Sequence, residues 1–275
     1  MNTALELAHG FHADVAEGTY HARVPGLVSK HAIDLVRRSP AHYKAWLDGA
    51  ESEDREAFRL GRATHCALLE PYRFSCEYVV EPEFGDCRKT ENKNRRNEWR
   101  EEHKNAIWLP ASDHAAILGM AKAIAAHPVA GKLFTGGHAE LTLRWRDAET
   151  GLECKARDDY FRDDLGAVID LKTAENAGAE AFRRSVVNFG YHRQHAHYAR
   201  GHQALGRPLK NFVFVVVEKA PPYAVAVYSL DSAAEAKGIE QVAEAMRTLA
   251  ECVRVGRYPG YPENIQTLEL PPWAA

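Results

Sequence analysis

The sequence predicts an α/β protein in which a mixed central sheet is flanked by helices and preceded by an N-terminal helical region. Segments with the periodicity of amphipathic helices occupy the first half of the chain. Apolar runs rich in β-branched residues begin only near residue 140, and further helical segments separate them. With 275 residues, 45% hydrophobic and 27% charged, the chain has a globular composition and can bury a full core.

Proline and serine mark the helix boundaries before the sheet. Ser29 suits an N-cap, and Pro40 suits the first position of a second helix. Pro71 and Pro128 each follow an amphipathic segment and should end it. The helical segments predicted in this region are 29–49, interrupted at Ser39-Pro40, then 53–70 and 112–127.

The second half of the chain supplies the sheet. The strands are predicted at 140–146, 152–160, 167–173, 211–218 and 223–230, and the helices at 179–205 and 232–255. We therefore expect a single domain that spans residues 1–275. It comprises an N-terminal extension (1–27), a helical part (28–135) with a basic segment (88–104), a sheet-bearing core (136–262) and a tail (263–275).

Composition limits the setting in which the chain works. Its five cysteines are scattered and form no CxxC pair, which favours reduced thiols in a cytoplasm. The sequence contains no run of eighteen apolar residues, so no membrane span is predicted, and the first residues lack the features of a signal peptide. The net charge of −3 is weak evidence against nucleic-acid binding, because local potential matters more than the total.

A strand and the turn before it carry the main chemical signal. Side chains two apart share one face of a strand, so Asp170 and Lys172 should point the same way while Leu171 enters the core. A hairpin around residues 163–166 would bring the Asp159 carboxylate beside Asp170. Two carboxylates and an ammonium at one point suit a divalent metal and the water that it activates.

The Asp-x-Lys triplet by itself proves little. Five acidic-x-Lys matches occur, at Glu91/Lys93, Glu102/Lys104, Glu153/Lys155, Asp170/Lys172 and Glu235/Lys237. Only the match at Asp170 ends an apolar run with a carboxylate one hairpin upstream. The context therefore carries the prediction, and the other four matches are interpreted as solvated charges.

Further polar residues have both a functional and an ordinary interpretation. Glu140 opens the strand that should pair with the strand of Asp159, and it is either a metal ligand or an ordinary surface glutamate. His65 follows Gly61 by one helical turn, and it is either a metal ligand or a histidine with ordinary hydrogen-bond partners. Gln194 and Tyr198 share a helical face. The basic segment from Arg88 to Lys104 is either a solvated surface or a flap that contacts phosphates.

These residues occur in the order of a known superfamily. The order is Gly61-x3-His65, Glu140, Asp159, Asp170-x-Lys172 and Gln194-x3-Tyr198. The flanking segments are Ser39-Pro40-Ala41-His42-Tyr43-Lys44, Leu69-Glu70-Pro71, Gly190-Tyr191-His192-Arg193-Gln194 and Glu218-Lys219-Ala220-Pro221-Pro222-Tyr223. Over residues 28–262 the chain resembles the PD-(D/E)XK (restriction-endonuclease-like) nucleases, specifically the RecB-like branch and the exonuclease VIII (RecE) catalytic domains of phage-associated exonucleases.

The resemblance implies a Mg²⁺-dependent deoxyribonuclease in which Mn²⁺ can substitute. It implies metal ligation by His65, Glu140, Asp159, Asp170 and the Leu171 carbonyl. Lys172 would stabilise charge at the phosphate, with Gln194 and Tyr198 supporting the site from the facing helix. The residues expected to contact DNA are Arg62, Lys89, Arg95, Arg96 and Arg100.

The chain departs from the family at its first catalytic motif. Many relatives have Arg-Pro-Asp where this chain has Arg157-Asp158-Asp159, so Asp158 competes with Asp159 as the ligand. Strand alternation would point only one of the two inward. Some relatives also hold an iron–sulfur cluster on four cysteines. This chain lacks a C-terminal cysteine group, so we expect no iron–sulfur cluster.

The activity that the resemblance implies is processive 5′-to-3′ degradation of double-stranded DNA from its ends, which leaves 3′ single strands for recombination. A closed homo-oligomer, a trimer or tetramer, and a single-strand annealing protein would be its partners, inside a bacterial host cell carrying a phage or prophage. Two alternatives remain. One is a structure-specific or single-strand nuclease of the same superfamily, and the other is a catalytically inactive DNA-binding or assembly module.

Overall fold

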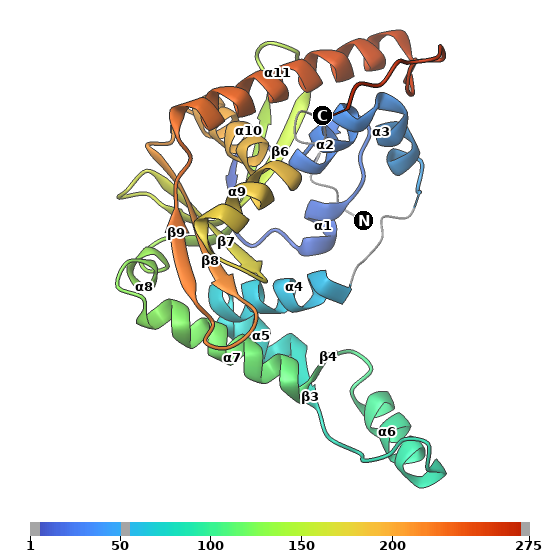
Figure 1. Ribbon diagram of the computed structural model, residues 1–275, viewed down its shortest axis with the longest axis vertical. Coiled ribbons are helices and arrows are strands. Elements are labelled where there is room, and N and C mark those ends of the chain that lie inside the picture. The colour runs from blue at the N-terminus through green and yellow to red at the C-terminus, as the bar shows by residue number, and fades with distance from the viewer. Residues whose placement is uncertain (1–5, 51–55, 271–275) are drawn as a thin grey trace.

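The computed structural model describes residues 6–50 and 56–270, and it confirms the predicted fold class. A seven-stranded mixed sheet runs in the order β1-β5-β6-β7-β8-β9, with β2 paired to β6. Helices α10 and α11 cover one face of the sheet, and α4 and α7 cover the other (Figure 1). The strands are β1 (Gly10–His12), β2 (Leu27–Val28), β5 (His138–Arg146), β6 (Glu153–Arg162), β7 (Ala167–Ala174), β8 (Asn211–Glu218) and β9 (Val225–Tyr228).

Most helices follow the boundaries that the sequence predicts. Ser39 ends α2 and caps α3, with Pro40 at the first helical position. The described helices are α1 (Glu17–His21), α2 (Lys30–Arg38), α3 (Pro40–Leu47), α4 (Glu56–Leu69), α5 (Pro71–Glu77), α6 (Thr90–Glu102), α7 (Ala111–Ala126), α8 (Ala130–Leu133), α9 (Ala179–Asn188), α10 (Tyr191–Ala204) and α11 (Ser232–Val255). The predicted start of α4 at 53–55 lies outside the described residues.

The predicted hairpin between β6 and β7 is present. The two strands are antiparallel, with Tyr160 opposite Ile169 and Arg162 opposite Ala167. Gly166 in the turn has φ +56°, a conformation that glycine adopts without steric cost. Strand β5 pairs antiparallel with the other edge of β6, whereas β7 and β8 are parallel. This order places the ends of β5, β6 and β7 next to one another.

A separate apolar core fills each face of the sheet. The core under α10 and α11 includes Leu143, Phe214 and Val242. The core under α4 and α7 includes Leu171 and Met120. Since each buried aliphatic or aromatic side chain contributes about 1.5–3 kcal/mol, both cores stabilise the sheet that carries the polar residues.

The structure differs from the sequence prediction in several places, among them the short helices α1, α5 and α8, which the sequence does not predict. The helix predicted over 179–205 is two helices, because Gly190 has φ +65° and a Cβ there would lie 2.1 Å from the Arg193 guanidinium. The sequence predicts residues 1–27 only as an extension, but β1 and β2 join the main sheet. Short-range periodicity does not reveal such edge strands of two or three residues, because their partners are distant in sequence.

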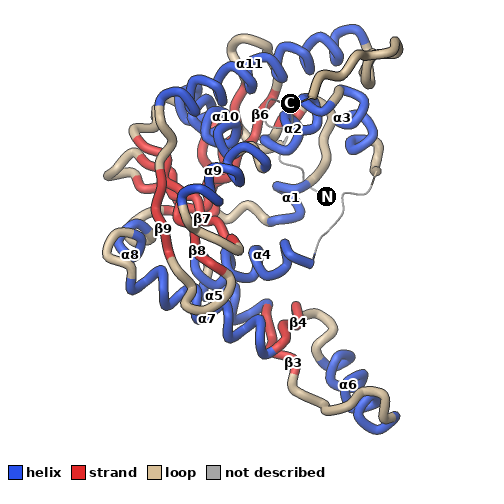
Figure 2. Tube along the Cα trace, viewed as in Figure 1, coloured by secondary structure: helices blue, strands red, loops and turns tan. Residues whose placement is uncertain are grey.

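The predicted helical part also contains an unpredicted pair of strands. Strands β3 (Tyr78–Glu81) and β4 (Ile107–Pro110) form a parallel two-stranded sheet. They lie at the base of α6, which projects away from the main body as an arm (Figures 1 and 2). We call residues 78–110 the α6 arm. Among the residues that the structure describes, no helix combines the length and the apolar character that crossing a bilayer requires.

Candidate active site

The alternation of side chains changes phase where β5 and β6 carry their acidic residues. Leu141 and its partner Asp158 lie on the α10 side of the sheet. Ala139 and its partner Tyr160 pack instead into the core under α4 and α7. Residues two apart on regular strands would share one side. Glu140, which lies between these pairs on β5, has φ +49°, a strained value for a residue with a side chain.

This phase change brings Glu140 together with Asp159 and His65. One possible ligand atom from each of the three residues lies within 4.8 Å of the others. His65 Nδ1 is 3.5 Å from Asp159 Oδ2, and the same carboxylate oxygen accepts a 2.8 Å hydrogen bond from the Leu171 backbone. The three residues, which we call the 65–140–159 cluster, come from α4, β5 and β6.

Close packing of α4 on the sheet positions His65. Gly61 lies one turn before it, and a Cβ at Gly61 would be 3.4 Å from Thr173 Oγ1 on β7. That distance is an ordinary van der Waals contact, so α4 packs on β7 here without requiring a glycine. The imidazole of His65 also hydrogen-bonds the backbone of Leu171, which brings the Leu171 carbonyl to the border of the cluster.

Asp170 and Lys172 form a second group beside the cluster. Lys172 Nζ lies 2.5 Å from Asp170 Oδ2, and Gln194 Nε2 donates a 2.5 Å hydrogen bond to Asp170 Oδ1. The Asp170 side chain is 0% exposed. The ammonium of Lys172 lies over the Tyr191 ring, 4.8 Å from its centroid. Asp170 and Lys172 therefore share one face of β7, and α10 fixes both.

Burial raises the pKa of the carboxyl groups at this site. The pKa of Glu140 rises to about 8, through burial and then through the charge of Asp159. Burial raises the pKa of Asp159 and of Asp170 to about 6, although Lys172 opposes both shifts. Burial, then the charge of Lys172, lowers the pKa of His65 to about 4. At neutral pH His65 is therefore neutral and can offer a lone pair.

The donor set fits a hard divalent cation. Glu140 and Asp159 place two carboxyl groups within 4.8 Å of each other, and their raised pKa values mean that a proton or a cation must neutralise the pair. Carboxylate oxygens with one imidazole suit Mg²⁺ or Mn²⁺, and no thiolate joins the 65–140–159 cluster. Lys172 behaves differently. Burial would lower its pKa, but Asp170 and Asp159 outweigh burial and raise it, so the ammonium stays charged.

The competing aspartate, Asp158, points away from the cluster. Its Oδ2 is 2.8 Å from His202 Nε2, and both side chains are fully buried between β6 and α10. This geometry favours Asp159 as the ligand. Tyr198 is buried one turn after Gln194, against the ring of Phe212, and burial raises the pKa of its hydroxyl well above the usual value. Tyr198 therefore packs against β8 and keeps its proton.

The expected DNA-contacting residues do not form one surface. Lys89 and Arg95 are exposed on the α6 arm, and Arg62 is exposed on α4. Arg100 instead pairs with Glu81 at 2.6 Å and stacks on Trp108. Arg96 is half-buried near the same glutamate. Arg100 is therefore bound within the arm through Glu81 and Trp108, whereas Lys89, Arg95 and Arg62 face solvent.

Two residues at the site had no role in the sequence prediction. Arg157 lies 3.9 Å from Glu140 and donates hydrogen bonds to Thr142 Oγ1 and the Val15 carbonyl. Tyr191 lies under Lys172. Arg157 belongs to the Arg157-Asp158-Asp159 motif and Tyr191 to the Gly190-Tyr191 motif. The residues that Arg157 and Tyr191 contact, however, lie on elements far away in sequence.

The fold and the site define the class of protein. A mixed sheet with facing carboxylates on paired strands, followed by Asp-x-Lys on the next strand, is the architecture of the PD-(D/E)XK nucleases. The profile of the PDDEXK-like domain of unknown function (DUF3799) matches residues 29–271, and the chain belongs to this family.

A solved structure shares the fold at low sequence identity. The crystal structure of a "Putative exonuclease" from Eubacterium rectale has a TM-score of 0.61 and 14% identity, covering 94% of this chain and 96% of that chain. At this identity the similarity shows the fold alone. A structure described as SSO0001 covers 69% of this chain and 84% of that chain at 15% identity, and its TM-score of 0.29 carries no argument. No curated protein matches the chain in sequence.

The raised carboxyl pKa values predict that metal binding depends on pH. A cation binds deprotonated carboxylates, so it must displace the protons of Glu140 below pH 8 and of Asp159 below pH 6. We expect Mn²⁺ affinity, measured by titration calorimetry, to fall on the order of 50-fold from pH 8 to pH 6. Glu140→Gln should bind more weakly at pH 8 and lose most of this dependence. Equal wild-type affinity at both pH values would contradict the cluster as the metal site.

Proposed function

We propose that this protein is a Mg²⁺-dependent deoxyribonuclease that degrades the 5′-ended strand of double-stranded DNA processively from its ends. The observation that carries the proposal is the 65–140–159 cluster beside the Asp170–Lys172 pair, on a PD-(D/E)XK fold. Mn²⁺ would substitute for Mg²⁺, because the donor set is oxygen with one imidazole. The Eubacterium rectale protein that shares the fold is named a "Putative exonuclease", which agrees with the proposal.

The cluster would hold the metal, with Asp170 and the Leu171 carbonyl at its border. When bound, a divalent cation supplies Lewis-acid polarisation of the phosphate and activates water for attack. Lys172 stays protonated, so it donates hydrogen bonds to the phosphate and to the attacking water rather than removing a proton. Gln194 fixes Asp170, and Tyr191 fixes the direction of the ammonium. Tyr198 braces α10 against β8.

The direct test compares linear duplex with covalently closed circular DNA, in Mg²⁺ and in EDTA. The proposal predicts degradation of the linear form in Mg²⁺, release of a 5′ label first, and survival of the circle. Cleavage of the circle or of single strands alone would favour the structure-specific or single-strand nuclease. Binding of DNA without any cleavage in Mg²⁺ or Mn²⁺ would favour the inactive module.

The α6 arm is proposed to guide the duplex through its exposed basic residues. Replacing Lys89, Lys93 and Arg95 by Ala should weaken the salt dependence of DNA binding. The slope of log binding constant against log salt concentration should fall in magnitude by about 2–3, since each phosphate contact contributes about 0.9. The single-turnover rate at saturating protein should stay unchanged. Lys237→Ala, on the exposed face of α11, is the control. An unaltered slope in the triple variant would mean that the basic residues of the arm are ordinary solvated charges and do not contact phosphates.

Processive degradation also requires a way to retain the duplex, and a chain with net charge −3 holds DNA weakly by charge alone. We propose a closed homo-oligomer, a trimer or tetramer, that encircles the duplex and passes the 3′ strand to an annealing protein. Light scattering at micromolar concentration should give three or four protomers. A monomer that releases DNA after a few nucleotides would leave a distributive nuclease.

A further inference from the structure

One exposed aromatic side chain lies beside the candidate metal site without a role in the proposed mechanism. Tyr72 is 83% exposed and lines a cavity of about 640 Å³ that Glu140 also lines. Glu140 therefore belongs both to this cavity, which we call the Tyr72 pocket, and to the 65–140–159 cluster. A cavity of this size is in the range that holds a nucleotide-sized ligand.

The backbone that carries Tyr72 is fixed. Pro71 occupies the first position of α5, and Ser75 Oγ donates a 2.7 Å hydrogen bond to the Tyr72 carbonyl. The ring thus stands on a short helix whose start cannot rotate freely. Stacking a flat ligand on this solvent-facing ring therefore orders only the two side-chain torsions of tyrosine, which costs little conformational entropy.

The charges of the Tyr72 pocket disfavour phosphate. Five carboxylates line it against two guanidinium groups; the carboxylates are those of Asp14, Glu17, Glu70, Glu77 and Glu140. Arg73 donates to three of them, at 2.7 Å to Glu70 and 2.8 Å to both Glu17 and Glu77. Arg157 donates to Thr142 and to the Val15 carbonyl and stacks on Tyr20. Protein acceptors therefore already hold both cationic groups.

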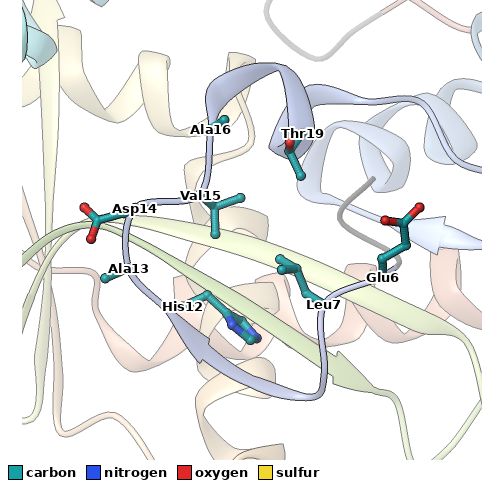
Figure 3. Close-up of a pocket in the computed structure, with 8 residues that line it drawn as sticks. All are labelled: Glu6, Leu7, His12, Ala13, Asp14, Val15, Ala16 and Thr19. Atoms are coloured by element: carbon teal, nitrogen blue, oxygen red, sulfur yellow. The ribbon is translucent and has the colours of Figure 1, made fainter. Parts of the chain in front are cut away.

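The N-terminal segment closes one side of the pocket. Asp14, Val15 and Ala16 lie on the turn between β1 and α1, where Figure 3 shows them lining a neighbouring pocket, and they also line the Tyr72 pocket. Arg157 ties this turn to β6, and Arg73 ties α1 to α5. These residues precede the part of the chain that the family profile matches, residues 29–271. The pocket is thus built jointly by the family core and by the segment before it.

We propose that the Tyr72 pocket receives the terminal nucleobase of the strand being cut, stacked on the Tyr72 ring, and that it does not bind the terminal phosphate. The inference rests on the proposed nuclease function. A nucleobase is neutral and presents a π face to the ring, whereas the carboxylates that line the pocket would repel a phosphate. Because Glu140 joins the pocket to the metal cluster, a base held there places the following phosphate toward the cluster.

Steady-state degradation of linear duplex tests the stacking contact. Tyr72→Ala should raise KM about tenfold with kcat unchanged, because stacking on one aromatic side chain is worth about that factor in affinity. Tyr72→Phe should retain the wild-type KM, since it keeps the ring. The matched control is Tyr261→Ala, which removes a ring that is 64% exposed next to His42. Because Tyr72 is so exposed, Tyr72→Ala should leave the protein folded.

Two further measurements separate a base from a phosphate. Duplex with 5-iodouracil at the strand end, irradiated with wild-type protein in EDTA, should crosslink to Tyr72. KM should be equal for ends with a 5′-phosphate and with a 5′-hydroxyl. A wild-type KM in Tyr72→Ala, a crosslink elsewhere, or a tenfold preference for the phosphorylated end would overturn the proposal while leaving the nuclease function intact. Absence of DNA degradation by the wild type would instead refute the nuclease function itself.

Discussion

Asp170→Asn should lower DNA cleavage at saturating Mg²⁺ by at least about a thousandfold, because metal and charge stabilisation of the transition state supply several kcal/mol. Asparagine keeps the shape of the side chain and can still accept the Gln194 hydrogen bond, but it removes the charge beside Lys172. Single-turnover assays of protein with a native circular dichroism spectrum measure the effect. Asp170→Ala should abolish activity as well.

Glu235→Gln provides a matched control for the loss of charge. Glu235 and Lys237 form the same acidic-x-Lys triplet on α11, outside the site; the Glu235 carboxylate is 44% exposed and lies 3.9 Å from His195, and Lys237 pairs with Glu240. This variant should cleave DNA at the wild-type rate. Cleavage by folded Asp170→Asn protein at a rate close to wild type would refute the assignment of the site.

Gly238→Ala should destabilise the fold by about 3 kcal/mol, although alanine normally favours a helix. A Cβ at Gly238 in α11 would lie 2.2 Å from the His192 carbonyl oxygen of α10, and backbone atoms cannot move aside as a flexible side chain can. Helix α10 also carries Gln194, so separation of the two helices should disturb the site. Urea denaturation measures the change as a lower midpoint.

Gly18→Ala is the control for this substitution. Gly18 also lies in a helix, α1, and no heavy atom is within 4 Å of the position that a Cβ would occupy there. The same change should therefore leave stability equal or raise it by up to about 1 kcal/mol. Equal midpoints for the two variants would mean that α10 and α11 do not approach as closely as the structure has them.

The sequence predicts the regular parts of the fold well because local periodicity and caps determine them. Helix α11 begins and ends where the pattern of residues 232–255 places it, and β8 has its predicted bounds at 211–218. The β6–β7 hairpin follows from two strands and the turn between them. The phase change at Glu140 does not follow, because it depends on a backbone angle that no local pattern encodes. Without that change, alternation cannot decide between Asp158 and Asp159.

Long-range contacts explain the remaining differences. Asp158 has a partner only because His202, 44 residues later, is buried against it. The sequence context singles out the acidic-x-Lys triplet at Asp170, but it does not predict that Gln194 holds Asp170 or that Tyr191 lies under Lys172. The basic segment at 88–104 gives no sign that Glu81 and Trp108 hold Arg100. Such contacts join elements that are distant in sequence, so neither local patterns nor composition can predict them.

Anomalous diffraction from crystals grown with Mn²⁺ would locate the metal site itself. We expect a manganese peak in contact with Glu140, Asp159 and His65, at the border formed by Asp170 and the Leu171 carbonyl. Asp159→Asn crystals should lose the peak, whereas Asp158→Asn crystals should keep it. A peak at another group of residues, or wild-type crystals with no peak at these three, would refute the 65–140–159 cluster as the metal site.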